Sequence, residues 1–300
     1  MVENHWSIDF ISSQLKQPTT FEEQLKKLEK RNLIIEDREY ALQILKRINY
    51  YYITGYLHNF KEKDSDNYIN GITFNHIYKI IKFDMRLRSI FLYAMEMIER
   101  SLKTNISYYF SHNYPNGNIS YFFDRDFENK DKHSKFISYV KKNIDNNEDL
   151  PFIQHHKQNY QGYYPTWVAI EVFTLGNLEN FYSLLKTPTQ KKIAKEYDCS
   201  KFQLANWIEA MRRFRNMLAH DTRLYNLKVI FTPAKKKENN ITTNKIFDYV
   251  LVMKYLVLDK EEWDNKIIID IRDVFNEFAS YIDIKCIGFP ENWETILKNK

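Results

Sequence analysis

Three residues of one segment carry the side chains that phosphate chemistry requires. Residues 204–226 read LANWIEAMRRFRNMLAHDTRLYN and contain Arg215, Asn216 and His220. The His220 imidazole can exchange a proton near neutral pH, so it suits general acid or base work. The planar Arg215 guanidinium matches two phosphate oxygens, and the Asn216 amide can orient the imidazole or donate to a phosphate. A base, an acid and a cation are what metal-independent cleavage of RNA through its 2′-hydroxyl needs.

The segment that carries these residues is predicted to be a helix over 201–219, with Ser200 as its N-cap. Arg215 falls on the apolar face, roughly 20° from Leu204 on an ideal helix of about 100° per residue. An arginine at such a core-facing position is expected to have an anionic partner. The apolar stripe itself consists of Leu204, Trp207, Ile208, Met211, Phe214 and Leu218, and Arg212, Asn216 and His220 form an adjoining polar ridge at four-residue steps.

Other interpretations of the same residues stay open. Arg215 can pair with a buried carboxylate, and His220 can merely cap the end of its helix. The His220–Asp221 doublet also suggests a metal phosphohydrolase, but such a site needs further histidines and an aspartate, and nothing in the sequence identifies them. The sequence therefore predicts no metal site. Candidate carboxylates for Arg215 are Glu96, Glu99 and Glu171. The adjacent His155 and His156 would point about 100° apart on a helix, so they could not easily share one metal ion.

Basic residues flank the three candidate catalytic residues and continue in a loop further along the chain. Residues 233–245, PAKKKENNITTNK, are predicted to be a polar loop. The net charge of +5 permits nucleic-acid binding without demanding it. The basic residues form either a phosphate-binding path that leads to the site or a solvated charge run. The predicted RNA-binding residues are Arg212, Arg213, Arg223, Lys235, Lys236 and Lys237.

Composition narrows the class of protein. The 300 residues contain no apolar run long enough for a transmembrane helix, and the N-terminus does not resemble a secretory signal. Cys199 and Cys286 are isolated, which is typical of a reducing compartment and predicts neither a disulfide framework nor a zinc cluster. We therefore expect a cytoplasmic protein that does not contact a membrane.

The remaining chain predicts a mainly α-helical fold with long loops. Residues 1–20 are expected to be a flexible arm, and Asp37 is expected to cap a helix that extends to Phe60. The longest periodic segment is 74–110, which we expect to pack centrally against the 201–219 helix. Further helices are expected over 21–31, after Pro165 with a break at Gly176–Asn177, in TQKKIAKEYD before Ser200, and over 246–258 and 261–282. Residues 287–300 should form a turn and a terminal helix, whereas 116–164 should hold short helices and long loops.

Acid–base pairs four residues apart recur along the predicted 74–110 helix. They are Asp84 with Arg88, Glu96 with Arg100, and Glu99 with Lys103. Such pairs stabilise isolated helices modestly when the acid precedes the base. We interpret them as the solvated face of the helix.

Several stretches together resemble a known family. Residues 215–220, RNMLAH, fit the Arg-x4-His signature of HEPN ribonucleases, with a polar residue after the arginine. The blocks at 47–60, 83–106 and 165–185, and the sequence IGFPENWE, resemble those of Abi-like abortive-infection proteins of the AbiD/AbiF type. The resemblance covers roughly residues 20–297. It implies a single helical domain over 21–300 that contains a HEPN core at about 74–230, related to the cores of RNA-guided type VI CRISPR effectors.

The resemblance implies phage defence by RNA cleavage, and some family members are encoded beside a small non-coding RNA that restrains them. We therefore expect a metal-independent endoribonuclease toxin without a cofactor. Two copies of the motif related by a two-fold axis would supply two histidines, so we expect a homodimer that pairs through the apolar stripe. One alternative is a non-catalytic RNA-binding module that holds a small RNA and signals through a partner. Another is a helical scaffold with no role toward RNA.

Overall fold

The computed structural model describes residues 15–114, 116–237 and 241–299, and within these ranges the chain forms helices and no strand. The mainly α-helical fold predicted from the sequence is therefore confirmed. The α-helices are α2 (Phe21–Glu29), α3 (Arg38–Leu45), α4 (Tyr50–Leu57), α5 (Phe74–His112), α6 (Lys130–Asp145), α7 (Pro151–Asn159), α8 (Thr166–Ala169), α9 (Leu175–Leu184), α10 (Thr187–Glu196), α11 (Lys201–Ala219), α12 (Ile246–Leu256), α13 (Lys260–Glu262), α14 (Ile268–Glu277) and α15 (Trp293–Leu297).

The chain divides into two compact units, with the boundary between Lys82 and Phe83. The boundary falls inside α5, so this helix contributes its first residues to one unit and the remainder to the other. The smaller unit contains α2, α3, α4 and the start of α5, and an isolated bridge joins Ile34 to Thr73. The flexible arm expected at the N-terminus lies mostly outside the described residues, and the described Thr20 caps α2.

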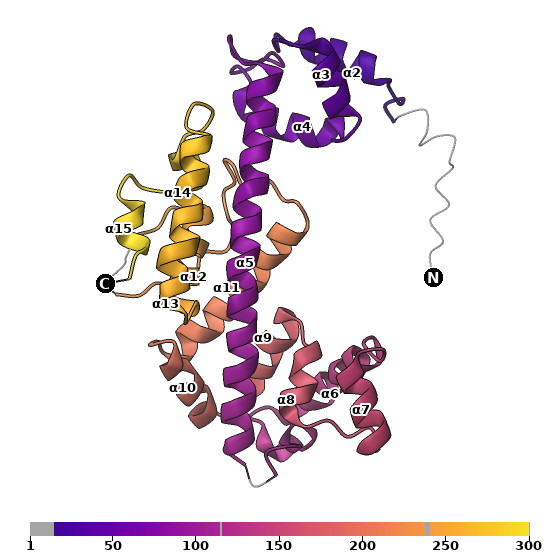
Figure 1. Ribbon diagram of the computed structural model, residues 1–300, viewed down its shortest axis with the longest axis vertical. Coiled ribbons are helices and arrows are strands. Elements are labelled where there is room, and N and C mark those ends of the chain that lie inside the picture. The colour runs from indigo at the N-terminus through magenta and orange to yellow at the C-terminus, as the bar shows by residue number, and fades with distance from the viewer. Residues whose placement is uncertain (1–14, 115, 238–240, 300) are drawn as a thin grey trace. The chain divides into compact units, whose positions relative to one another are not determined.

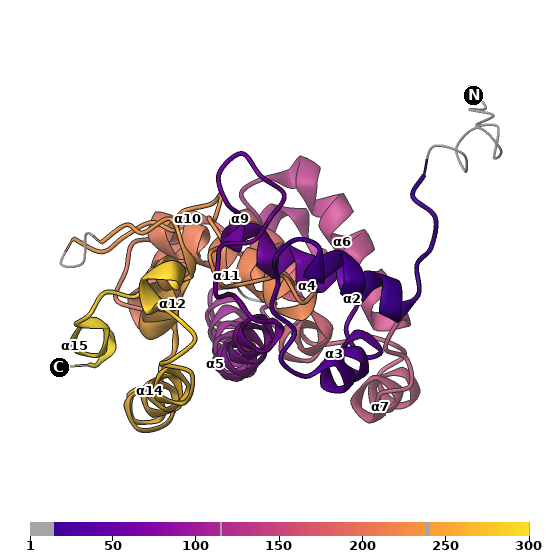
Figure 2. The same ribbon diagram turned by 90° about the horizontal axis from the view of Figure 1, so that it is seen from above.

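In the larger unit the helices gather on both sides of α5. Two perpendicular views show α12, α14 and α15 on one side of α5 and α6 and α7 on the other (Figures 1 and 2). Helix α11 packs against α9, α10 and α12. It also reaches α5 through the rings of Phe214 and Phe91, whose centroids lie 5.6 Å apart. The two helices expected to pack centrally therefore do contact each other.

Capping side chains start the helices where local sequence predicts. The Asp37 side chain accepts from the Tyr40 N–H at 2.9 Å and begins α3. Ser200 and Gln203 form a reciprocal capping box at the start of α11. Such caps satisfy backbone donors that have no partner inside the helix, which is why these boundaries are readable from sequence.

Three expectations about helix boundaries are wrong. The helix expected up to Phe60 is two helices, because Asn49 caps a new start by accepting from the Tyr51 N–H at 2.7 Å. Gly176–Asn177 do not break a helix but lie inside α9, where Asn177 completes a capping box with Thr174. Residues 116–164 were expected to hold only short helices, but they contain the 16-residue α6. Its buried residues His133, Phe136 and Val140 are few, but their helical spacing is enough to give the helix one buried face.

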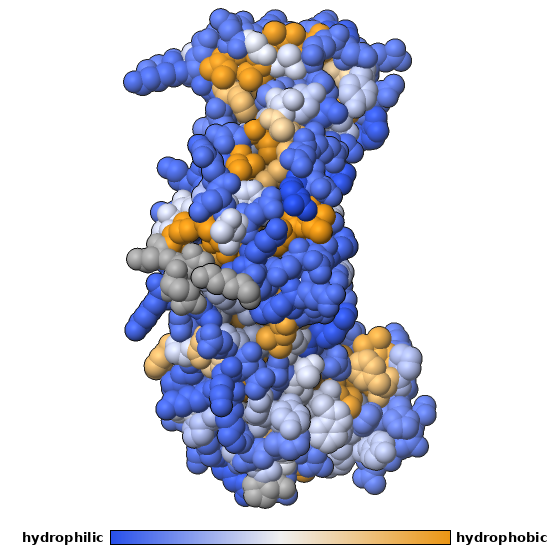
Figure 3. All heavy atoms as spheres, turned by 60° about the vertical axis from the view of Figure 1, so that its left-hand side comes forward, coloured by the Kyte–Doolittle hydropathy of each residue, from blue (hydrophilic) through white to orange (hydrophobic). Residues whose placement is uncertain are grey.

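Most of the apolar side chains lie in the interior. Phe110, Phe127, Phe136 and Phe181 form a ring cluster with centroid separations of 5.0–6.0 Å. On the face shown in Figure 3, hydrophilic residues predominate and apolar ones form small separate patches. None of the described helices combines the length and the apolarity that a membrane span requires.

Candidate functional site

A groove lies among α5, α11 and the chain that enters α9. It consists of two adjoining hollows of about 370 Å³ and about 640 Å³. Both hollows are lined by Glu99, Lys103, Glu171 and Arg215, so they form one continuous surface. The first hollow adds Leu92, Met95, Glu96 and Arg100 of α5, and the second adds mainly Asn143, Asn146 and Asn147, residues 172–176, Arg212 and Asn216.

Arg215 is exposed in this groove and not buried in the apolar stripe, so the predicted core-facing position is wrong. The cause is a rotation of the buried face along α11. On an ideal helix Phe214 and Leu218 lie at roughly 280° and 320° from Leu204, whereas Arg215 lies at roughly 20°. Phe214 stacks on Tyr249 at 5.0 Å and meets α5, so packing in this half of α11 centres on that side. Arg215 is left at the edge of the stripe.

The three arginines of α11 have different partners. The Nε atom of Arg212 donates to the Glu179 carboxylate of α9. Arg213 is paired with Glu209 at 2.8 Å, and this hydrogen bond raises the pKa of the Arg213 guanidinium. Within the described part of the chain, Arg215 has neither a hydrogen bond nor an ion pair. None of the carboxylates considered for it from the sequence pairs with it, although Glu96, Glu99 and Glu171 all line the groove.

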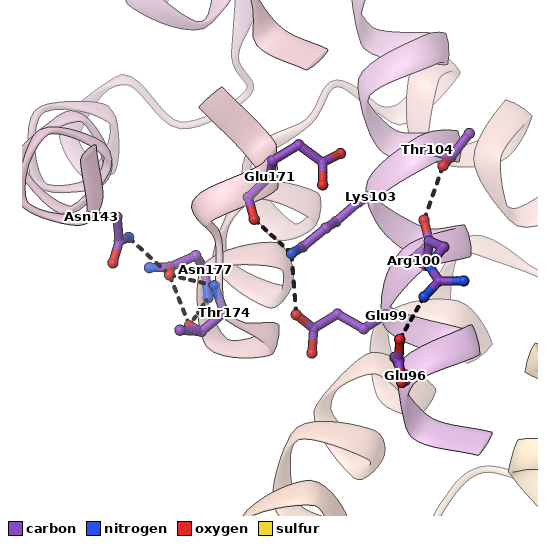
Figure 4. Close-up of polar contacts among 9 residues, drawn as sticks. All are labelled: Glu96, Glu99, Arg100, Lys103, Thr104, Asn143, Glu171, Thr174 and Asn177. Atoms are coloured by element: carbon purple, nitrogen blue, oxygen red, sulfur yellow. Dashed lines mark hydrogen bonds and ion pairs between the residues drawn. The ribbon is translucent and has the colours of Figure 1, made fainter. Parts of the chain in front are cut away.

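The α5 wall of the groove is charged, and its charges are mostly paired with each other. Lys103 Nζ lies 3.3 Å from the Glu99 carboxylate and donates to the Glu171 carbonyl at 2.8 Å (Figure 4). Arg100 donates to Glu96 at 2.5 Å, with both side chains mostly exposed. The expected solvated face is therefore correct for the Glu96–Arg100 pair, whereas Lys103 is largely covered, with 14% of its side chain exposed.

The opposite wall of the groove consists of amides and of the start of α9. Asn143 donates to the Asn177 side chain at 2.9 Å, and Asn177 is held in turn by Thr174 (Figure 4). This capped first turn of α9 faces the groove, because Thr174 and Gly176 both line it. The N-terminal end of a helix carries a partial positive charge, so this wall attracts anions.

The structure places Asn216 in the groove and His220 just beyond it. Arg212 and Asn216 line the second hollow together, which agrees with the predicted ridge on α11. His220 is the exposed C-cap residue of the same helix, about 6 Å further along the axis than Asn216 at 1.5 Å per residue. Neither His220 nor the half-buried Arg223 that follows it lines either hollow. One chain thus brings Arg215 and Asn216 to a groove and places the imidazole at the end of the same helix, outside the groove lining.

Two residues that sequence reasoning assigned to a solvated face are buried behind this helix end. Asp84 is fully buried and Arg88 is 6% exposed, so that expectation is wrong for this pair. Their contacts run to the chain that follows His220. The signal available in the sequence was their position: both lie among Phe83, Leu87 and Phe91 on an otherwise apolar face.

The lysine loop lies at the other end of α11. Gln203 donates to the Lys235 carbonyl at 3.0 Å, and Lys236 pairs with Asp198 at 2.8 Å while its ammonium lies over the Tyr255 ring. Lys237 is exposed. Thirteen residues of helix separate Gln203 from Asn216, about 20 Å at 1.5 Å per residue. The structure therefore does not bring the lysines to Arg215 and His220, and their role toward RNA stays a prediction.

The arrangement can bind a phosphate and exchange a proton. Arg215 and the α9 N-terminus offer positive charge on one groove, Asn216 offers a donor, and His220 offers an imidazole. Among residues 15–114, 116–237 and 241–299, no group of three or more His, Cys, Asp or Glu side chains is placed to hold a metal ion.

The described residues define an all-α protein in which Arg215 lines a groove without a partner among them and the exposed His220 ends the same helix. The model of the Abi-like protein family matches residues 43–226, so the chain belongs to the Abi-like family. Membership implies a role in abortive infection, the defence in which an infected cell stops phage propagation. The matched residues include α5, α9 and α11, which form the groove. Neither the curated proteins nor the solved structures contain a match.

Proposed function

We propose that this protein is a metal-independent endoribonuclease that acts in abortive infection. Arg215 binds the scissile phosphate, His220 transfers a proton at the 2′-hydroxyl or at the leaving 5′-oxygen, and Asn216 donates to the phosphate or orients the imidazole. A guanidinium lowers the energy of the crowded phosphate charge, and an imidazole supplies general acid or base catalysis of about 10²–10⁴-fold. These are the roles that the resemblance to the Arg-x4-His signature implies for the three residues.

The observation that carries the proposal is the free guanidinium of Arg215. Every other arginine of α11 is held by a carboxylate, whereas Arg215 lines both hollows without a hydrogen bond or ion pair in the described part of the chain. A cation that faces a groove with no protein partner is available to a ligand anion. The neighbouring carboxylates of Glu96 and Glu99 are already compensated by Arg100 and Lys103, so the wall repels a phosphate less than its composition suggests.

A single copy of the motif contains one histidine, whereas in-line cleavage of RNA uses both a base and an acid. We therefore propose a homodimer in which each copy contributes one His220. The apolar stripe of α11 cannot be the interface, because each of its six apolar residues is at most 1% exposed within one chain. Met85 and Leu92 of α5, 46% and 36% exposed, offer an alternative surface, and Leu92 lines the groove beside Arg215.

The first test is cleavage of RNA by purified protein in excess EDTA. We expect cleavage to continue and to leave 2′,3′-cyclic phosphate or 3′-phosphate ends, because the proposed groups act without a metal. Arg86→Gln is a matched control, since Arg86 is an exposed arginine of α5 that pairs with Glu277 and lies outside the groove lining. A strict requirement for magnesium or manganese with 3′-hydroxyl products would contradict the proposal.

The dimer is tested by mixing wild type with His220→Ala, which is expected to be inactive alone. If one site needs the His220 of both copies, a mixed dimer should be inactive, so cleavage after subunit exchange should fall with the square of the wild-type fraction. A fall in simple proportion to the wild-type fraction, in a mixture shown to form heterodimers, would show that each chain acts by itself.

One observation favours the non-catalytic alternative, in which the groove holds a small RNA without cleaving it. His220 is absent from both hollow linings, so RNA can occupy the groove without meeting the imidazole. That alternative predicts a defined RNA that copurifies with the wild type and with His220→Ala alike. It also predicts that Arg215→Ala loses this RNA, whereas the catalytic proposal predicts a larger loss of cleavage than of binding.

A further inference from the structure

The chain leaves α11 through a turn of defined geometry directly after His220. The Thr222 N–H donates to the Met217 carbonyl at 3.1 Å, and the His220 N–H donates to the Asn216 carbonyl at 3.0 Å. Asp221 lies between them with φ of +51°. This is a Schellman turn, whose left-handed position is usually occupied by glycine. An aspartate tolerates this position better than most residues but still needs support from its surroundings.

Helix α5 supplies that support from outside the turn. The two terminal nitrogens of Arg88 contact Asp221 Oδ1 at 3.3 Å and the Thr222 carbonyl at 3.0 Å. One turn earlier on α5, the Asp84 carboxylate accepts from the Leu224 N–H at 2.7 Å and the Tyr225 N–H at 3.1 Å. Two charged residues of one helix thus hold the five residues after His220, 221–225.

Burying the charged side chains of Asp84 and Arg88 costs free energy, so these two residues need a physical explanation. Asp84 is fully buried and Arg88 is 6% exposed. Arg88 Nε is buried without a hydrogen-bond partner in the described part of the chain, so the guanidinium is not fully satisfied. Burying a charged side chain costs free energy that burying an apolar residue of similar size does not. What apolar residues cannot do at these positions is bind the carboxylate and the backbone of the 221–225 turn.

We propose that Asp84 and Arg88 are positioning residues, which set the place of His220 relative to Arg215 by fixing the 221–225 turn on α5. The inference rests on the proposed function, because it assigns a consequence to the position of the imidazole. Arg215 is placed by the regular part of α11, whereas His220 is the cap residue, where the helix no longer dictates the direction of the chain. The imidazole therefore depends on what holds the next five residues.

The test compares Arg88→Gln with Arg86→Gln, two substitutions that remove one positive charge from the same helix. We expect Arg88→Gln to lower the single-turnover RNA cleavage rate at least tenfold and to change RNA affinity less than twofold, because Arg88 does not line the groove. Arg86→Gln should change neither quantity more than twofold. Thermal melting of both variants shows whether they are folded.

A second substitution separates positioning from a general loss of structure. Asp221→Gly introduces the residue that prefers the left-handed conformation, so the turn can close with less help from Arg88. We expect the double variant Arg88→Gln/Asp221→Gly to cleave RNA at least three times faster than Arg88→Gln alone. If Arg88→Gln does not fold, Arg88→Lys, which keeps the charge but loses the two-pronged contact, takes its place in the same comparison.

A readout that does not depend on activity is the pair of imidazole ¹H–¹⁵N signals of His220, assigned with His220→Gln. They should shift in Arg88→Gln, return toward the wild type in the double variant and stay unchanged in Arg86→Gln. Unchanged His220 signals and an unchanged cleavage rate in a folded Arg88→Gln protein would overturn the inference. If the wild type cleaves no RNA, the proposed function fails, while the His220 signals still decide whether Arg88 positions the imidazole.

Discussion

The two ends of α11 use their polar side chains in opposite ways. At the N-terminal end, Asn206 accepts from the Ala234 N–H at 2.6 Å and Trp207 donates to the Ala234 carbonyl at 2.6 Å. At the C-terminal end, the side chains of Arg215, Asn216 and His220 make no hydrogen bond or ion pair anywhere in the described part of the chain. One end of the helix is thus occupied with holding a neighbouring segment, and the other leaves its polar groups available.

This difference shows which basic residues are candidates for ligand binding. The lysine loop and the arginines of α11 look equally suited from sequence, because both are dense in positive charge. In the structure Lys236 is engaged by Asp198 and by the Tyr255 ring, whereas Arg215 has no protein partner in the described residues. Polar groups that a functional site keeps without partners usually lower the stability of the protein, whereas polar groups that are hydrogen-bonded to the backbone raise it.

The largest expected effect concerns the free end of α11. Arg215→Ala and His220→Ala should each lower RNA cleavage by about 10²–10⁴-fold, because each removes a group that we propose acts on the reacting phosphate or proton. Stability should change by less than about 0.5 kcal/mol, since both side chains are exposed and have no partner to lose in the described part of the chain.

Growth of a bacterial host that expresses each variant and thermal melting of the purified proteins provide the two measurements. A well-folded His220→Ala protein with full toxicity would refute the catalytic role of this end. Arg86→Gln, with its exposed ion pair on α5, should resemble the wild type in both measurements.

An intermediate effect is expected at the occupied end, where stability and not cleavage should fall. Trp207→Phe leaves the Ala234 carbonyl without its indole donor, which should cost about 1–3 kcal/mol of unfolding free energy. Ser200→Ala removes the helix cap and should cost about 1 kcal/mol. Urea unfolding measures both, and Ser183→Ala is the control, because its exposed hydroxyl caps no helix start. If these variants, assayed at urea concentrations where they are still folded, lost as much cleavage as Arg215→Ala, the contrast between the two ends would not hold.

The smallest effect concerns the salt dependence of RNA binding. If Lys235, Lys236 and Lys237 bind phosphates, neutralising all three should weaken binding to many RNAs alike. The slope of log affinity against log salt should then flatten by about 0.7 for each phosphate of a single strand that no longer meets a lysine. We expect the exposed Lys237 to contribute more than Lys236, whose charge is already paired.

Filter binding over a salt series, with each single lysine variant beside the triple variant, makes this measurement. A slope equal to that of the wild type in the triple variant would show that RNA does not extend to this end of α11. A flattened slope would instead place RNA along much of the helix, whose 19 residues span about 28 Å.

Local sequence determined the helices of this protein to a large extent. The bounds of α11, the cap at Asp37 and the long periodic α5 were all predictable, because capping and apolar spacing act within a few residues. The breaks at Asn49 and before Thr174 were not, since asparagine and glycine serve both as helix caps and as breakers. The Arg-x4-His pattern likewise pointed to α11 before any packing was known.

Only the tertiary structure decided which of these residues face one another. The ideal helical wheel put Arg215 among the apolar residues, but Phe91 and Tyr249 pack against one side of α11 and leave Arg215 in the groove. The same spacing put Asp84 and Arg88 in solvent, although they hold the turn more than 130 residues later in the chain. Periodicity reports that a residue lies on a face, whereas burial and pairing depend on which distant element covers that face.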